Sequence, residues 1–307
     1  MDSGGIANFQ TVFNLATAVV LIPFADWLVK LSLVVVKDDK PEAERHPELH
    51  TLDEKLYNSP AMALSVTMKA VAAAGRLAHL NFERGCQVLA KYDPVLAAEI
   101  DKDEDCIDQF TDNSDRFLIG LSKVVETEAD DRQLDMLMQT VPNFERIGDY
   151  ATNMVELAQR LQSENAAFSD MAKKELALIT QAVNEILEIT VDAFSKDDNE
   201  AAKAIEPLEE TIDDMIMMLK DRHTKRLKNG QCSIASGLVF MEALTYFERA
   251  SDQCSSIAVM MLARHNEQIL QNHYEYLREI HAGNDVAYLA EKDRRREQYI
   301  KPLKQIF

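Results

Sequence analysis

Residues 144–149 read Phe-Glu-Arg-Ile-Gly-Asp, and residues 247–252 read Phe-Glu-Arg-Ala-Ser-Asp. A second pair of similar stretches lies upstream at nearly the same offset: residues 104–108 read Glu-Asp-Cys-Ile-Asp, and residues 209–213 read Glu-Glu-Thr-Ile-Asp. Two independent matches at nearly the same offset indicate an internal duplication.

Apolar residues recur at helical spacing from Ala61 onward. The chain has only 9 Gly and 8 Pro in 307 residues, which disfavours the many turns of an all-β fold. We therefore predict an all-α fold in which two tandem three-helix units form a helical bundle. The expected helices cover residues 60–91, 94–126, 129–163, 168–196, 198–228 and 233–265, followed by charged helical residues at 267–300.

The same acidic pattern, Glu-x-x-x-Asp, occurs in every matched helix. Side chains four residues apart lie on one face of a helix, where two carboxylates repel each other unless a cation or protons intervene. Oxygen ligands suit hard cations such as Mg²⁺, Ca²⁺, Mn²⁺ or oxidised iron. Asn153 follows Asp149 by four residues and would add an amide oxygen. The predicted metal ligands are Glu104, Asp108, Glu145, Asp149, Asn153, Glu209, Asp213, Glu248 and Asp252.

Two other interpretations of these acids remain open. With 52 Asp and Glu residues, the spacing also arises by chance, as at Glu126 and Asp130, and acidic helix faces are usually only solvated. The body would then be a structural interaction domain that binds no metal. A carboxylate-bridged metal enzyme is disfavoured because the sequence has no Glu-x-x-His motif. We expect no enzymatic activity and assign no catalytic residue.

The formal net charge of −19 disfavours nucleic acid as a partner, because such a surface repels phosphate backbones. Residues 6–36 differ from the rest and are strongly apolar. Asp26 and Lys30 interrupt this segment four residues apart, where they can neutralise each other. The length fits a membrane-spanning helix with Trp27 at the interface. One alternative is a buried helix of a soluble protein, and a second is a signal peptide, which the lack of a basic start and of a clear small-residue cleavage site disfavours.

Residues 142–153 (PNFERIGDYATN) closely resemble the signature helix of PhoU proteins, and residues 247–252 resemble it more distantly. PhoU proteins regulate phosphate uptake, and their Glu-x-x-x-Asp motifs bind metal clusters. The resemblance therefore implies metal roles for the eight paired acids given above. It also implies a regulatory module that controls phosphate uptake.

Residues 9–15 (FQTVFNL) and 21–24 (LIPF) resemble the last membrane segment of bacterial type II Na⁺/phosphate cotransporters, which often carry a PhoU-like domain at their C-terminal end. This resemblance implies a bacterial inner-membrane location with the helical body in the cytoplasm, and the transmembrane core of such a cotransporter as partner. The family's transport core is absent from these residues, so we expect no transport by this chain alone, and a homo-oligomer stays open. The residues assigned to the membrane segment are Phe13, Asn14, Pro23, Phe24 and Trp27.

These observations divide the chain into five parts. The first is a hydrophobic, transmembrane helix that ends a transporter domain, and the second is a polar linker containing three prolines. Two repeats and a charged helical tail follow. The predicted boundaries are 1–36, 37–60, 61–163, 164–266 and 267–307.

Overall fold

The computed structural model describes Phe13 and the residues 45–282 and 285–306. The chain divides into two compact units, Met1–Pro47 and Glu48–Phe307. Throughout the described residues of the second unit, the secondary structure is helical and contains no strand. The predicted all-α fold is confirmed.

Each repeat contributes three long helices, and a helical tail follows. Two short 3-10 helices, η3 (Pro47–His50) and η4 (Glu54–Asn58), precede them. The first repeat consists of α3 (Pro60–Ala90), α4 (Pro94–Leu121) and α5 (Glu128–Ser163). The second consists of α6 (Asp170–Lys196), the short α7 (Asn199–Lys203), α8 (Ile205–Lys228) and α9 (Ile234–His265). The tail forms α10 (Glu267–Gln271), α11 (His273–His281) and α12 (Val286–Gln305).

Local sequence signals explain most helix ends. The Asp93 carboxylate accepts hydrogen bonds from the backbone N–H groups of Val95 and Leu96, and Pro94 occupies the first position of α4, where its missing N–H does no harm. Helix α8 ends before Gly230, which adopts φ +68°, a left-handed conformation that favours glycine. Because these signals lie within a few residues of each helix end, the sequence alone predicts most helix boundaries to within a few residues.

The structure departs from the predicted helices at two places. Helix α4 ends at Leu121 rather than at residue 126, because the chain turns back and Thr127 caps α5 by accepting the Asp130 N–H. The predicted helix 198–228 is broken between α7 and α8. Pro207 cannot donate an N–H to the carbonyl four residues earlier, and Lys203 at that position is the last residue of α7.

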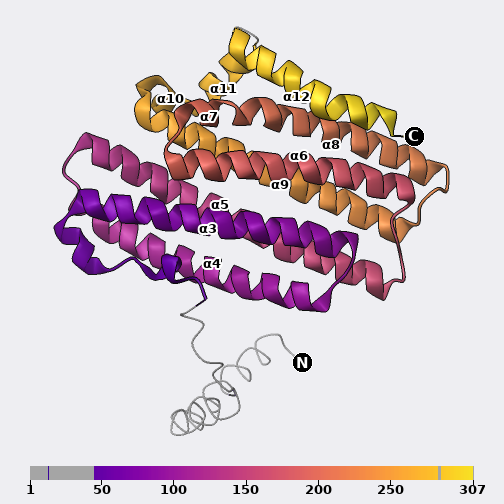
Figure 1. Cartoon of the computed structure of the whole chain (residues 1–307), viewed down its shortest axis with the longest axis horizontal. Helices are drawn as coiled ribbons and strands as arrows, with labels where there is room; N and C mark the ends of the chain where they lie inside the picture. The colour runs from indigo at the N-terminus through magenta and orange to yellow at the C-terminus, as the bar shows by residue number, and fades with distance from the viewer. Residues whose placement is uncertain (1–12, 14–44, 283–284, 307) are drawn as a thin grey trace, which may run out of the picture. The chain divides into compact units, whose positions relative to one another are not determined.

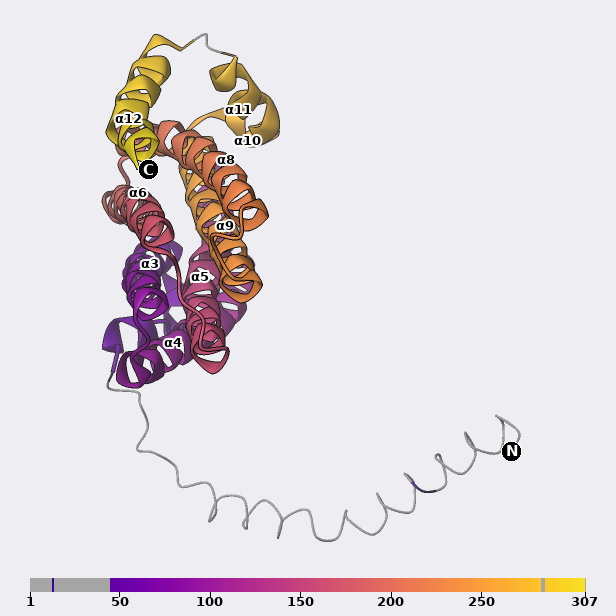
Figure 2. The same cartoon turned by 90° about the vertical axis from the view of Figure 1, so that its right-hand side faces the viewer.

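The helices pack as a layered bundle. Helices α3, α5, α6 and α9 form the interior, where α3 contacts α5 and α6, and α9 contacts α5 and α6. Figure 2 shows α4 at one end of this bundle and α8 at the other, with α12 beyond α8. The two repeats therefore share one core, and the tail helices pack mainly on the second repeat (Figure 1), with an ion pair from Glu267 of α10 to Arg132 of α5.

The two repeats exchange aromatic contacts across this core. Phe144 on α5 packs edge-to-face on Phe194 of α6, with ring centroids 5.6 Å apart. Phe247, its counterpart on α9, packs on Phe82 of α3 at 5.9 Å. Each repeat thus places its signature phenylalanine against an aromatic ring of the other repeat, so neither core is complete alone.

The predicted membrane helix falls largely outside the described residues. Phe13 is helical and 59% exposed, whereas Asn14, Pro23, Phe24 and Trp27 lie outside the described residues. Among the described helices, α3 is long and apolar enough to cross a membrane, and 61% of its most apolar window is buried within the protein. Packing against α5 and α6 accounts for this apolar composition.

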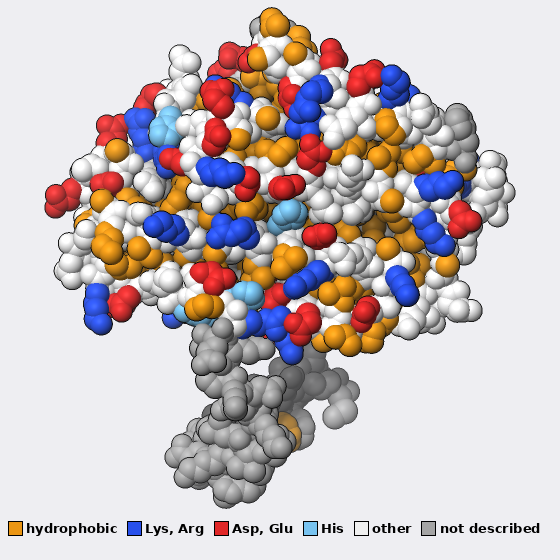
Figure 3. All heavy atoms as spheres, in the orientation of Figure 1, with side chains coloured by type: hydrophobic (Ala, Val, Ile, Leu, Met, Phe, Trp, Pro, Cys, Tyr) orange, Lys and Arg blue, Asp and Glu red, His pale blue; other side chains and the backbone are white. Residues whose placement is uncertain are grey.

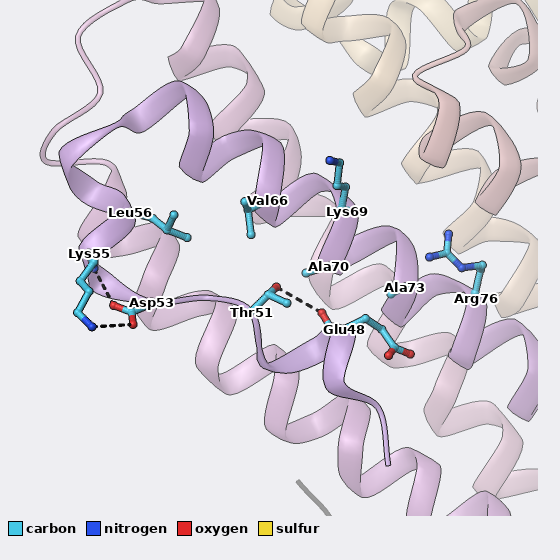
Figure 4. A pocket seen from close by; sticks show the side chains of 10 residues that line it. All are labelled: Glu48, Thr51, Asp53, Lys55, Leu56, Val66, Lys69, Ala70, Ala73 and Arg76. Carbon is cyan, nitrogen blue, oxygen red and sulfur yellow. Dashed lines mark hydrogen bonds and ion pairs between the residues drawn. The ribbon is translucent and has the colours of Figure 1, made fainter. Parts of the chain in front are cut away.

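The surface of the body is mixed in charge, and one hollow opens beside α3. On the face seen in Figure 3, acidic and basic side chains are interspersed, so the net negative charge is not concentrated there. A hollow of about 780 Å³ lies between residues 48–56 and α3, with Val66, Ala70 and Ala73 along its helical side (Figure 4). None of the paired acids lines this hollow, so it is separate from the candidate metal site.

Candidate metal centres

The first acidic cluster joins α4 and α5. Carboxylate oxygens of Glu104 and Asp108 on α4 and of Asp149 on α5 all lie within 4.8 Å of one another. Gly148, the residue before Asp149, faces α4, and a Cβ atom there would lie 3.2 Å from Ile107 Cδ1. The absence of a side chain at Gly148 therefore lets the two helices approach where the three acids meet.

The second cluster has the same construction in the second repeat. Oxygens of Glu209 and Asp213 on α8 and of Asp252 on α9 also lie within 4.8 Å of one another. Ser251 takes the place of Gly148 and is fully buried, with its hydroxyl donating to the Glu248 carbonyl at 2.7 Å. The two sites are therefore equivalent in position but differ at the helix crossing.

Burial and mutual repulsion disturb the ionisation of the first cluster. Burial, and then the charges of Asp108 and Asp149, raise the pKa of Glu104 to about 7. Burial and the charges of Asp149 and Asp108 raise the pKa of Glu145 to about 6. The pKa of Asp149 is raised by burial and by Asp108, although Arg146 opposes this. The negative charges are thus incompletely neutralised by the protein.

The pKa values of the carboxyl groups in the second cluster are shifted more strongly. Burial, and then the charges of Glu206 and Asp213, raise the pKa of Glu209 to about 9. Burial and the charge of Asp252 raise the pKa of Asp213 to about 6. A carboxyl group whose pKa is raised this far, in a cluster of other acids, is a candidate functional group. A cation bound between these acids would lower their pKa values again, because it stabilises the ionised form.

The remaining predicted ligands lie at the edges of the clusters. Glu145 is half-buried and feels the charges of two first-cluster acids, but it does not belong to the close triad. Glu248 accepts an ion pair from Lys220 of α8 at 2.6 Å. Asn153 lies one turn beyond Asp149 on α5 and is half-buried. For these three residues a metal role stays a prediction.

Several side chains near the second cluster were not predicted from the sequence. Lys220 comes from the partner helix α8, and the tail supplies His281 and Lys292, which pair with Glu210 beside Glu209. The charge-rich composition of the tail was the only signal for these contacts. As a result, two lysine ammonium groups of the protein itself, those of Lys220 and Lys292, lie beside the second cluster.

Three converging carboxylates from two helices provide only oxygen ligands. Such a donor set fits a hard cation, which prefers oxygen ligands and would offset the repulsion that raises the pKa values. The members of each triad are half-buried or exposed, so solvent can complete the coordination shell.

The PhoU domain family matches residues 71–158 and 176–261. This chain belongs to the PhoU domain family. The two PhoU matches fall one in each structural repeat and contain all eight paired acids. The charged tail, residues 267–307, lies outside both matches.

Relatives and solved structures agree with this membership. YjbB of Escherichia coli (strain K12), named for inorganic phosphate export, is 21% identical over 272 residues, covering 88% of this chain and 50% of that protein. The chain thus spans about half the length of this relative. A PhoU homolog of Aquifex aeolicus, named as an accessory protein of a phosphate-specific transport system, is 25% identical over 158 residues, covering 51% of this chain and 70% of that protein.

Crystal structures of PhoU share the fold of the body. PhoU from Streptococcus pneumoniae, titled a phosphate transport system regulatory protein, superposes with a TM-score of 0.61 at 19% identity, covering 68% of this chain and 98% of that chain. PhoU from Pseudomonas aeruginosa gives a TM-score of 0.61 at 21% identity, with the same coverage. At these identities the likeness establishes the PhoU fold.

Proposed function

We propose that this chain is a PhoU-like regulatory module that binds hard metal cations at its two acidic clusters and controls sodium-dependent phosphate uptake. Metal binding is supported by one observation: the same arrangement of three carboxylates occurs at equivalent helix crossings in both repeats. Chance acidic spacing does not explain why acids on two different helices converge twice. A solvated face also leaves the raised pKa values of Glu104 and Glu209 without compensation.

In this proposal the metal is held by side chains from two helices and acts as a clamp. Glu104 and Asp108 on α4 and Asp149 on α5 would hold one cation, and the corresponding acids on α8 and α9 a second. The bound cation supplies positive charge that joins the helices of each repeat. Because the donors are half-exposed, the site can exchange its ion with solvent, as a sensor requires.

Elemental analysis of the purified full chain after incubation with excess Mn²⁺ and desalting tests the metal sites. We expect Asp149→Ala to lower the metal content by about half and an Asp149→Ala/Asp252→Ala double variant to remove almost all bound metal, because each triad loses one of three ligands. These variants should stay folded, since removing one of three mutually repelling carboxylates does not open a core cavity.

A matched control lies on the same helix. Asp131 and Asp135 on α5 are also acids four residues apart, and both are exposed. An Asp131→Ala/Asp135→Ala variant should bind as much Mn²⁺ as the unmodified chain. Equal metal content in the cluster variant and in this control would contradict metal binding and favour a purely structural helical domain.

The transport part of the proposal is supported by the resemblance of residues 9–15 and 21–24 to a cotransporter membrane segment and by relatives whose names refer to phosphate transport. We place the body in the cytoplasm beside the inner membrane, with the transmembrane core of a Na⁺/phosphate cotransporter as its partner. The segment before residue 37 would anchor the body there.

Radiolabelled phosphate accumulation in native cells tests this regulatory role. Cells carrying the Asp149→Ala/Asp252→Ala variant should show a severalfold change in accumulation that disappears when Na⁺ is replaced by K⁺, while the Asp131→Ala/Asp135→Ala control behaves as wild type. Membrane fractionation in the same cells should place the full chain in the membrane and a chain beginning at Leu52 in the soluble fraction. Accumulation that is unchanged, or changed independently of Na⁺, contradicts the proposed link.

A further inference from the structure

A cavity of about 720 Å³ lies between the C-terminal tail and the second repeat. Its lining comes from α7, the first turn of α8 and the end of α9 on one side, and from the tail helices on the other. Its volume falls in the range of small-molecule sites. None of the eight paired acids lines it, so it is distinct from the metal clusters.

Apolar side chains line the cavity on both of these sides. Val259 and Leu262 from the end of α9 face Ile269, Leu277 and Ile280 from the tail. These side chains provide a wall that favours a hydrocarbon chain and offers it no hydrogen-bonding partner. A small inorganic ion would leave this wall unused.

A buried carboxylate also lines this cavity. Glu206, in the first turn of α8, is only 7% exposed. Its carboxylate accepts a hydrogen bond from Ser255 Oγ at 2.5 Å and lies 2.8 Å from His281 Nε2. These contacts hold the carboxylate in place. Burial and the charge of Glu206 raise the pKa values of Tyr276 and Tyr288, so both phenols lie in the field of this acid.

Tyr288 supplies an unsatisfied polar group beside this acid. The residue is 7% exposed, and its hydroxyl is buried without a hydrogen-bond partner among the described residues. Buried hydroxyl groups are normally paired, so this one indicates a site for a ligand atom. The Lys292 ammonium already lies 5.9 Å from the Tyr288 ring centroid, which shows that the ring is placed to face a cation.

The charges around the cavity favour a positive ligand. Lys203 is paired with Glu200 at 2.8 Å, and Glu291 is paired with Arg294 at 2.5 Å. Asp285 caps α12 and adds a further negative charge to the lining. The lining contains four acids, Glu200, Glu206, Asp285 and Glu291, against the single lysine Lys203, so its formal charge is negative and disfavours an anion.

From these observations we propose that the cavity binds an organic ammonium ion with an apolar body. The ammonium group lies beside Glu206 and the rings of Tyr276 and Tyr288, and the hydrocarbon part lies along the wall formed by α9 and the tail. The Tyr288 hydroxyl accepts a hydrogen bond from the ammonium. A carboxylate combined with aromatic rings is a chemical environment that recognises such cations. The proposal does not depend on the metal clusters or on phosphate.

Isothermal titration calorimetry of the full chain with n-hexylammonium chloride tests the proposal, and sodium hexanoate provides the anionic counterpart of equal chain length. We expect hexylammonium to bind and hexanoate not to bind. Glu206→Gln should weaken hexylammonium at least about tenfold, because it removes the buried charge with little change of shape. Glu200→Gln is the matched control, because this lining acid is 83% exposed and not buried like Glu206, and the variant should bind hexylammonium as the unmodified chain does.

Tyr276→Leu gives a second test that does not alter the buried acid. Tyr276 is partly exposed, so the substitution should leave the fold intact while removing one aromatic ring, and hexylammonium binding should weaken. The proposal is overturned if hexylammonium does not bind, if hexanoate binds equally well, or if the Glu206→Gln and Tyr276→Leu variants match Glu200→Gln.

Discussion

A Phe144→Ala variant should lose about 3–5 kcal/mol of unfolding free energy, as is usual when a buried Phe is truncated to Ala. Phe144 is only 1% exposed and packs edge-to-face on Phe194 of the other repeat. Its ring also fills the space above Gly75 of α3, where a Cβ atom would lie 2.7 Å from it. Truncation would therefore leave a cavity where three helices from both repeats meet.

Urea unfolding followed by far-UV circular dichroism measures this loss. Ile119→Ala is a suitable control because Ile119 is also a large apolar residue but is 53% exposed, and we expect a change within about 0.5 kcal/mol. A single cooperative transition that shifts as a whole would support one core shared by the repeats. A loss below about 1 kcal/mol for Phe144→Ala would show that the repeats do not depend on this contact.

The metal-free protein should become less stable as the pH rises from about 5 to about 8. Glu104 and Glu209 have folded pKa values of about 7 and about 9, both above the ordinary 4.5 expected in the unfolded chain. Above about pH 4.5 the folded state therefore binds more protons than the unfolded state, so stability falls as the pH rises. Allowing for screening by water at these half-exposed acids, we expect a loss on the order of 2–4 kcal/mol.

Thermal unfolding in EDTA across this pH range tests the expectation. Glu209→Gln should raise the melting temperature relative to wild type at about pH 8 but change it little at about pH 5, because the wild-type group is then protonated in the folded state. Asp131→Ala, which alters an exposed acid outside the clusters, should leave the slope with pH unchanged. Parallel curves for wild type and Glu209→Gln would show that this carboxyl group is not perturbed.

The repeats and the positions of the acids could be predicted because they depend on local spacing. Asp149 and Asp252 were identified from the match between two sequence stretches, and the structure places each beside two acids of a neighbouring helix. The ion pair that ties Glu248 to Lys220 could not be predicted, because the two residues lie on different helices and share no sequence pattern. The helical periodicity of residues 198–228 predicted one continuous helix, although Pro207 is a local signal for the break between α7 and α8.

Sequence alone therefore determined that this chain is helical, that it is duplicated, and that acids lie one turn apart on single helix faces. Helical periodicity is a property of neighbouring residues, and it can be read without knowing what the helix contacts. Only the tertiary structure decided which acids meet, that the repeats exchange aromatic contacts, and that the tail closes a cavity beside Glu206. Those facts depend on how side chains from distant segments fit together, for example on whether Gly148 allows α4 to approach α5.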